Sequence, residues 1–383
     1  MSGAPRILVL FGNVPMHGQE RGNIEALDAL HQTGCDVLFL IREEWTRDTI
    51  QAELKRRGLQ FVFVPYFDSV RHGVSLRVWW NNLKGIAGGS WQLLRQIRSF
   101  RATHIHAGST ANVLNFLPAL MLTRLPLVFR AGDVPPQHHW LWRMVWRFTS
   151  WRAARFVCNS RFIQNTLDGM GIPPEKTSVI YNAPPSRGKS DGPALPQVNA
   201  VGLTYAYMGQ LILEKGVAEL VDAAILHCKH YPDSCFLIAG DFNWNNPFAA
   251  GLMARVSAEG LTDSIRFIGY VSAIDQLLDQ ADVHVCPSIC EEGLANVVLE
   301  AKQAGVPSVI FPSGGLPELV THGVDGYVCR ENTAIALEVA FSCYEQDKTL
   351  ASSQGKAAQA SLKTIGIDTF AGRWRRIYES VTT

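Results

Sequence analysis

Two glutamates in the stretch EEGLANVVLEA, Glu292 and Glu300, have the types and spacing for chemistry, with Gly293 beside the first. A helix that starts near Gly293 would carry Glu300 about two turns in, facing the interior of the protein. A buried carboxylate is costly unless a polar group partners it. The sequence therefore predicts that either a protein donor or a ligand meets Glu300.

A lysine close to a predicted strand end is the next candidate. In MGQLILEKG, Lys215 follows a strand that closes at Gly209 and opens a helix, where backbone N–H groups and the helix dipole favour an anion. A lysine ammonium there suits a phosphate. The alternative is a solvated lysine at a helix start, paired with Glu214. Similarly, SGGLPE (313–318) has glycines that let a ligand approach closely, or it is an ordinary tight turn.

Several common kinds of site do not occur in the sequence. Neither half begins with a G-x-G-x-x-G dinucleotide fingerprint, since FGNVPMHG and MGQLILEKG follow the first strands, and a kinase-type phosphate loop is also absent. The eight cysteines are scattered, with no His or Cys pair at a zinc spacing. We therefore expect reduced, buried cysteines in a cytoplasmic protein, and we disfavour two-domain dehydrogenases.

Short apolar runs alternate with amphipathic segments along the chain, which indicates parallel sheets covered by helices on both faces. The strands predicted in the first half are 6–11, 36–41, 61–65, 103–107, 125–131, 155–160 and 177–182. A Pro- and Gly-rich segment then interrupts the pattern, which restarts in LTYAYMG, CFLIAGD, IRFIGYV, DVHVCPS and PSVIF. The predicted fold class is α/β, with two doubly wound Rossmann-like domains that bind ligands at the carboxyl ends of their strands.

The 383-residue length also favours two domains. We predict a first domain over 1–182, a linker over 183–202, a second domain over 203–365, and a C-terminal helix over 366–383 that crosses back to the first domain. The N-terminal apolar run is too short for a signal peptide. The most apolar region, 114–129, is interrupted by two prolines and an arginine and cannot span a bilayer.

Charge is divided unevenly between the halves. Residues 1–190 hold 23 Lys and Arg against 12 Asp and Glu, and the remainder holds 12 against 22. The basic half includes 139–156, where Arg143 and Arg147 share a helical face beside Trp140 and Trp146, and 76–101 repeats this composition. Such segments suit an anionic membrane surface, or they are ordinary helices with buried tryptophans and solvated arginines. Peripheral attachment to the inner face of the membrane therefore stays open.

The second half carries a resemblance to a known family. MGQLILEKGVAELVDA, LIAGD, IRFIGYV and the run from ADVHVCPS to DGYV resemble the second domain of retaining glycosyltransferases with the GT-B fold, two Rossmann-like domains facing each other across a cleft. More narrowly they resemble the "glycosyltransferase group 1" family, which includes glycogen-synthase- and sucrose-synthase-like enzymes. The likeness covers nearly all of 203–330. The first domain is similar more loosely, through Gly12 and Gly18 after strand one, THIHAGS, VCNS and VIYN.

The resemblance implies that the two glutamates hold a nucleotide-sugar donor. Glu292 would lie near the sugar hydroxyls and Glu300 would accept hydrogen bonds from the ribose, which suits a carboxylate because a diol donates twice. The backbone of 293–295 (Gly293, Leu294 and Ala295), at a helix N-terminus, would hold the diphosphate. Further donor contacts are expected from Gly12, Gly18, Gly209, Gln210, Lys215 and Asp241.

Two positions depart from the family pattern. Gln210 stands where an arginine is usual, which weakens the expected hold on the diphosphate unless another arginine, such as Arg21 or Arg161, replaces it. Many members also have a histidine after the fifth strand of the first domain, where this chain has Asp133 within FRAGDVPP. We expect Asp133 to help position a substrate. The catalytic residues expected are thus Lys215, Glu292 and Asp133.

The function implied by the resemblance is transfer of a sugar from a nucleotide-diphosphate sugar to an acceptor hydroxyl with retained configuration, in cell-surface polysaccharide or glycolipid assembly. We expect no cofactor, no metal and no nucleic-acid partner. A lipid-linked acceptor would fit the Trp- and Arg-rich segments. The alternatives are a nucleotide-sugar epimerase of the same fold, a phosphorylase, and a non-catalytic glycosyltransferase-like subunit. The sequence leaves the sugar, the acceptor and the oligomeric state open.

Overall fold

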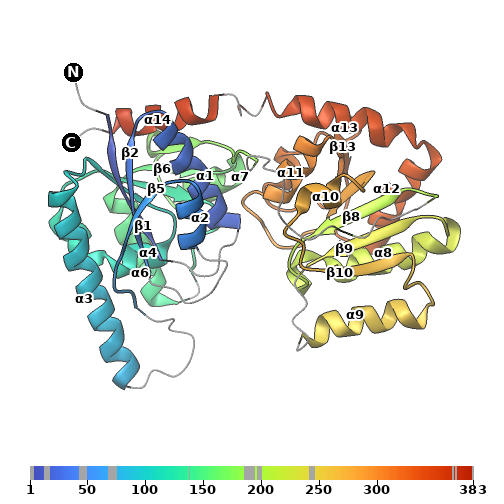
Figure 1. The fold of residues 1–383 in the computed structure, drawn as a ribbon, viewed down its shortest axis with the longest axis horizontal. Helices are drawn as coiled ribbons and strands as arrows, with labels where there is room; N and C mark the ends of the chain where they lie inside the picture. Colours follow the sequence, from blue (N-terminus) through green and yellow to red (C-terminus); the bar gives the residue numbers. More distant parts are fainter. Residues whose placement is uncertain are drawn as a thin grey trace. The chain divides into compact units, whose positions relative to one another are not determined.

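The computed structural model describes residues 4–12, 18–42, 50–67, 76–137, 139–184, 195, 201–240, 246–364, 366 and 369–381. The chain divides into two compact units (Figure 1). Unit 1 comprises Met1–Ala183 together with Asp368–Thr383, and unit 2 comprises Pro184–Ile367. Most of the predicted linker, 183–202, lies outside the described residues.

The sheet of unit 1 is parallel, in the order β3-β2-β1-β4-β5-β6-β7. Its strands are β1 (Arg6–Phe11), β2 (Asp36–Ile41), β3 (Gln60–Phe63), β4 (His104–Ala107), β5 (Leu127–Ala131), β6 (Ala153–Cys158) and β7 (Thr177–Val179). Its helices are α1 (Gly18–Gln32), α2 (Ile50–Arg56), α3 (Leu76–Ser99), α4 (Thr110–Asn115), α5 (Leu117–Leu122), α6 (Trp140–Arg152), α7 (Arg161–Gly169) and α14 (Phe370–Ser380).

Helices cover both faces of this sheet because its strands are apolar on both sides. Leu8 and Leu10 of β1 join a core with α3 to α7, whereas Ile7 and Val9 face α1, α2 and α14. The last helix, α14, therefore belongs to unit 1. Its Tyr378 hydroxyl is hydrogen bonded to His106 Nδ1 on β4 at 2.6 Å. Burial, and secondly the nearby Arg130, lower the pKa of His106 to about 3, so this contact uses a neutral imidazole.

The sheet of unit 2 is also parallel, in the order β10-β9-β8-β11-β12-β13. Its strands are β8 (Thr204–Met208), β9 (Cys235–Ala239), β10 (Ile265–Gly269), β11 (Val283–Cys286), β12 (Ser308–Ile310) and β13 (Gly326–Val328). Its helices are α8 (Val217–His230), α9 (Pro247–Ala258), α10 (Ile274–Leu278), α11 (Asn296–Ala304), α12 (Ala334–Gln346) and α13 (Thr349–Ser361).

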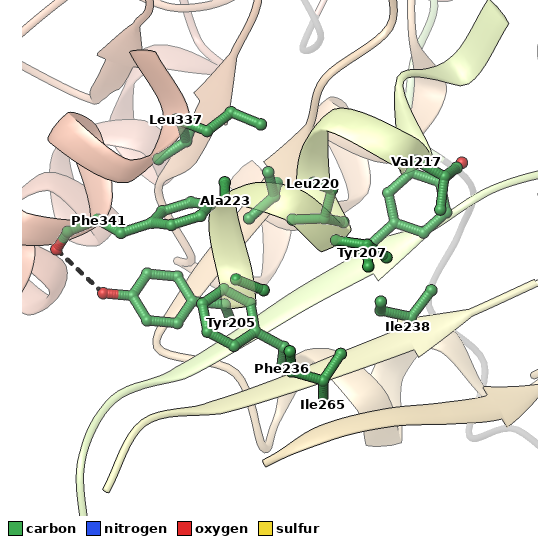
Figure 2. Packing of buried hydrophobic residues seen from close by; sticks show 14 of the residues in the cluster. Tyr205, Tyr207, Val217, Leu220, Ala223, Phe236, Ile238, Ile265, Leu337 and Phe341 are labelled. Carbon is green, nitrogen blue, oxygen red and sulfur yellow. Dashed lines mark hydrogen bonds between the residues drawn. The ribbon is translucent and has the colours of Figure 1, made fainter. Parts of the chain in front are cut away.

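Alternate side chains of β8 point to opposite faces of the sheet, so unit 2, like unit 1, has a core on each face. Tyr205 and Tyr207 face α8, α9 and α12, while Ala206 and Met208 face α10 and α11. Tyr205 stacks on Phe236, and its hydroxyl donates to the carbonyl of Phe341 at 3.1 Å (Figure 2). This bond satisfies the polar end of a fully buried ring.

The predicted doubly wound architecture is confirmed, and the differences concern short or terminal segments. Strand β13 was not predicted, because three residues beginning with glycine give no periodic signal. The helix expected to start near Gly293 starts instead at Asn296, so Glu300 lies just over one turn in. Among the helices of the described ranges, none is both long and apolar enough to cross a membrane.

Candidate functional site

The strand order changes direction at one point of each sheet. In unit 2 the chain runs outward from β8 to β9 and β10, then returns to the other side of β8 with β11. Ligands of open parallel sheets bind at such a switch point, outside the carboxyl ends of the strands. The loop after β8, 209–216, and the loop after β11, 287–295, meet there. These loops contain most of the predicted donor-binding residues.

Backbone contacts hold the two loops together. The amides of Ile289 and Cys290 both donate to the carbonyl of Glu214, at 3.0 and 3.1 Å. Gly216 has a φ of +66°, and a Cβ there would lie 1.8 Å from the carbonyl oxygen of Pro287. Only glycine satisfies both conditions. The buried Tyr207 hydroxyl donates to the carbonyl of Gln210 at 2.8 Å, which fixes the start of the first loop.

This packing brings two of the predicted catalytic side chains into contact. Lys215 Nζ lies 2.7 Å from Glu292 Oε1, and the Ser288 hydroxyl donates to the same carboxylate. The interpretation of Lys215 as a solvated partner of Glu214 is therefore wrong. Burial opposes the ammonium charge, but the Glu292 carboxylate outweighs it and raises the pKa of Lys215. The lysine is a cation at neutral pH, and its side chain is 27% exposed.

The loop after β12 supports Glu292 from the other side. Gly315 N donates to the carbonyl of Glu292 at 2.8 Å. Gly314 has a φ of +54°, and a Cβ there would lie 2.3 Å from the same oxygen. In the structure these glycines of SGGLPE thus approach the chain's own backbone. Glu292 is held at its carbonyl by this loop and at its carboxylate by Lys215 and Ser288.

The start of α11 completes this edge of unit 2. Gly293, Leu294 and Ala295 are buried, and Ala295 is the N-cap residue, which provides no side-chain cap. The first N–H groups of a helix lack partners within the helix and favour an anion. Glu300 is buried in this helix, at 6% exposure. The expected ribose contact of Glu300 stays a prediction.

A buried ion pair anchors the same helix. Lys302 Nζ lies 2.7 Å from Asp325 Oδ2 and donates to Ser361 Oγ of α13 at 2.8 Å. Asp325 also accepts from the amide of Thr321 at 2.7 Å. Burial lowers the pKa of Lys302, and Asp325 partly offsets the fall. Helix α11, which carries Glu300, is thereby fixed to α13 and to the segment before β13.

In unit 1 the corresponding switch point lies between β1 and β4. Gly12 follows β1, and a Cβ there would lie 1.8 Å from the Tyr66 ring. Its amide donates to Asn112 Oδ1 at 3.2 Å, and the Tyr66 hydroxyl donates to the same oxygen at 2.5 Å. The amide of Gly12 therefore already has a protein acceptor. Gly18 is the first residue of α1, and residues 13–17 lie outside the described residues.

Asp133 lies at the same edge, just after β5, and is exposed. The buried Arg130 at the end of β5 donates to Asn182 Oδ1 at 2.6 Å. Burial lowers the pKa of the Arg130 guanidinium to about 10, and the carboxylates of Asp133 and Glu20 limit the fall. Asp133 therefore faces a fixed positive charge, and its role toward a substrate stays a prediction.

The remaining predicted residues have mixed outcomes. Asp241 lies outside the described residues. On α6, Trp140, Arg143 and Arg147 are exposed, but Trp146 is buried against Phe129 and Phe156. The expectation of a surface role for Trp146 is wrong, because that side of α6 packs on the sheet.

Sequence reasoning missed two site residues. Ser288 lies four residues before Glu292 and donates to its carboxylate, and it stands in the stretch PSICEEG directly after a strand. A hydroxyl between a predicted strand end and a predicted catalytic acid was a usable signal. Arg130 could not be found in this way, because a charged residue within the apolar run LPLVFRA gives no sign of a buried cation.

Two family models match the chain, one in each half. Residues 199–361 match "Glycosyl transferases group 1", and residues 16–183 match "Glycosyltransferase Family 4". The first match contains the Lys215–Glu292 pair, α11 and all six strands of unit 2. The second contains six of the seven strands of unit 1, β2 to β7. The two matches together leave out little of the chain beyond its ends.

Individual relatives agree with these models. The chain is 26% identical over 247 residues to the amylovoran biosynthesis glycosyltransferase AmsK of Erwinia amylovora, covering 61% of this chain and 57% of that protein. It is 30% identical over 179 residues to the lipopolysaccharide core biosynthesis mannosyltransferase LpsB of Rhizobium meliloti, covering 45% and 50%. The chain thus spans only about half the length of these two relatives.

A solved structure matches over nearly the whole chain. The crystal structure of Anabaena Alr3699/HepE in complex with UDP and glucose superposes with a TM-score of 0.79 at 19% identity, covering 98% of this chain and all of that one. At this identity the likeness concerns the fold. The chain thus has the GT-B fold, and each of its halves matches a glycosyltransferase family model, residues 199–361 that of the group 1 glycosyltransferases.

Proposed function

We propose that this protein transfers a sugar from a nucleotide-diphosphate sugar to an acceptor hydroxyl. The observation that carries the proposal is the Lys215–Glu292 contact of 2.7 Å at the switch point of unit 2. It sets a cation and a carboxylate beside the N-terminus of α11, whose N-cap residue is an alanine. A nucleotide diphosphate needs positive partners, and a sugar needs hydrogen-bond acceptors. The HepE structure, with UDP and glucose bound, supports a donor of this class.

Lys215 is proposed to stabilise the diphosphate as it leaves. An ammonium has three N–H donors, and Glu292 occupies one of them, so two remain for phosphate oxygens. Charge stabilisation of this kind is usually the largest catalytic term. Because Gln210 replaces the usual arginine, Lys215 carries a larger share of the charge stabilisation of the diphosphate. We infer that transfer needs neither cofactor nor divalent metal, because Lys215 and the helix dipole serve the leaving group.

Glu292 is proposed to meet the sugar. Its carboxylate is shared by Lys215 and Ser288, both of which bind Oε1, so Oε2 is the oxygen for a sugar hydroxyl. We propose retention of the anomeric configuration, with the acceptor attacking from the face that the diphosphate leaves. The leaving phosphate could then take the acceptor proton, without a separate base.

Substitution of the two glutamates is expected to cause different kinetic defects. Glu300→Gln should raise the KM for the donor more than it lowers kcat, because the amide weakens hydrogen bonds to the ribose. Glu292→Gln should mainly lower kcat or change sugar preference, because its partners are the sugar and Lys215. Steady-state kinetics of both variants measure the split, with the exposed neighbour Glu291→Gln as the matched control. Identical defects in the two variants would contradict this division.

The acceptor is proposed to belong to cell-surface polysaccharide or glycolipid assembly, and to be lipid-linked. The names of AmsK and LpsB, which concern amylovoran and the lipopolysaccharide core, support this class. The exposed Trp79, Trp80 and Trp91 of helix α3 support a lipid. The acceptor hydroxyl itself is not specified by these observations.

A donor and acceptor screen tests the function. Thermal unfolding is first measured with a panel of nucleotide sugars, since a ligand at about 100 times its Kd adds about 2.7 kcal/mol to stability. Donors that stabilise the protein are then offered with lipid-linked and free sugar acceptors. We expect acceptor-dependent release of nucleoside diphosphate. Turnover of donor without acceptor, to an epimer, would support the epimerase instead, and no turnover with any bound donor would support a non-catalytic subunit.

A further inference from the structure

Helix α3 presents its largest apolar side chains to solvent. Trp79, Trp80 and Trp91 are 53%, 55% and 59% exposed. Figure 1 shows α3 along one side of unit 1, with its first turns extending past the sheet. Exposed apolar side chains that cluster on one element mark interaction surfaces, whereas single ones are common.

Glycines occupy the inward side of α3 where the helix passes closest to the rest of unit 1. A Cβ at Gly85 would lie 2.5 Å from the carbonyl oxygen of Tyr66, and one at Gly89 would lie 2.5 Å from Asn115 Nδ2. The helix therefore packs closely on 65–67 and α4 without large side chains, and its core contacts come chiefly from Leu93 and partly buried neighbours. The interpretation of 76–101 as an ordinary helix with buried tryptophans is contradicted.

The exposed face repeats one pairing at a helical spacing. Lys84 Nζ lies 5.9 Å from the centre of the Trp80 ring, and the Arg95 guanidinium lies 5.7 Å from that of Trp91. Both are cation–π contacts between residues four apart. The two pairs are 11 residues apart, which is about three helical turns or about 16 Å, so they share one face. We call this face the α3 stripe; it comprises Arg77, Trp80, Lys84, Trp91, Arg95 and Arg98.

The surrounding sequence contains almost no negative charge. Between Asp68 and Asp133 there are eight Lys or Arg residues and no Asp or Glu. Helix α5 packs against α3, and its Met121 and Leu122 are 68% and 74% exposed. The surface thus combines rings and aliphatic side chains with cations that have no acidic neighbour in this stretch of sequence.

We propose that the α3 stripe docks on the surface of an anionic lipid bilayer, with the helix lying along the membrane plane. Indole rings settle at the boundary of headgroups and acyl chains, and the adjacent cations meet lipid phosphates. Each Trp–cation pair supplies a ring for the headgroup boundary and a cation for a lipid phosphate. The spacing of the two pairs distributes these contacts along the helix.

Cosedimentation with vesicles tests the proposal, without donor or acceptor, so its failure would leave the transferase function untouched. We expect the protein to bind vesicles of equal parts phosphatidylcholine and phosphatidylglycerol, less at raised salt, and not phosphatidylcholine alone. Each basic residue at such a surface contributes about 1 kcal/mol, so Lys84→Gln with Arg95→Gln should weaken binding about thirtyfold. Trp80→Ala with Trp91→Ala should also abolish most binding.

The matched control removes the same charge from α6, which the sequence offered as a second candidate for the membrane surface. Arg143→Gln with Arg147→Gln alters two exposed arginines of unit 1 outside the α3 stripe. We expect this variant to keep most of its vesicle binding. Binding lost only in the α6 variant, or absent in the unaltered protein, would overturn the proposal. So would binding to single-stranded oligonucleotides but not to vesicles, or a dimer on sizing columns that the α3 substitutions dissociate.

Discussion

Replacing Lys215 by alanine is expected to lower kcat by about a hundredfold or more, the scale of losing about 2.7 kcal/mol of charge stabilisation. Lys215 is the cation that the fold brings to the switch point of unit 2, and Gln210 provides no second charge there. The raised pKa of Lys215 keeps the ammonium protonated at neutral pH. The variant also leaves the Glu292 carboxylate without its ion-pair partner, which adds repulsion toward a diphosphate. Steady-state and single-turnover kinetics with a donor from the screen measure the loss.

The controls separate charge from folding. Lys229→Ala removes a lysine of α8 that pairs with Glu259 at the surface, and it should leave kcat unchanged. The double variant Lys215→Ala with Glu292→Gln removes the unpaired carboxylate and should bind donor better than Lys215→Ala alone, without recovering kcat. If Lys215→Ala turns over at close to the rate of the unaltered enzyme, the lysine does not serve the leaving group.

How far the sequence could predict the fold depended on the length of each apolar pattern. Strands β1, β2 and β5 are buried on both faces and appear as continuous apolar runs, so they were predicted to within two residues. The start of α11 was misplaced because Gly293 to Ala295 give no capping signal, and the actual N-cap residue is an alanine. Local patterns thus predicted the layers, but not each terminus.

The candidate site depended on contacts that no local pattern shows. The resemblance implied that Lys215 and Glu292 bind the same ligand. It did not imply their direct contact, which joins residues 77 positions apart. On the helical wheel of α6, Trp140 and Trp146 lie about 60° to either side of Arg143, so the wheel cannot say which tryptophan is buried. Packing on Phe129 and Phe156 selects Trp146. The sequence therefore predicted an amphipathic helix, but not which of its sides is buried.

Breaking the Lys302–Asp325 pair is expected to have the largest effect on stability. Both residues are nearly fully buried, and the lysine joins α11 to Asp325 and to Ser361. Lys302→Met fills a similar volume but leaves a buried carboxylate without its cation. Removing one partner of a buried pair typically costs about 3–5 kcal/mol. Differential scanning calorimetry should show a lower unfolding temperature for the transition of unit 2, and the exposed Lys356→Met on α13 serves as the matched control.

The double variant Lys302→Met with Asp325→Asn decides what the pair contributes. Asparagine keeps the oxygen that accepts from the Thr321 amide but carries no charge. Because the cost of the single variant comes mainly from the unpaired carboxylate, the double variant should recover most of the lost stability, a coupling of neighbouring residues. A double variant as unstable as Lys302→Met alone would instead show that the ion pair itself stabilises α11. Donor affinity should follow stability in these variants, since α11 carries Glu300, and a variant that is stable but binds donor poorly would place Lys302 in the positioning of Glu300.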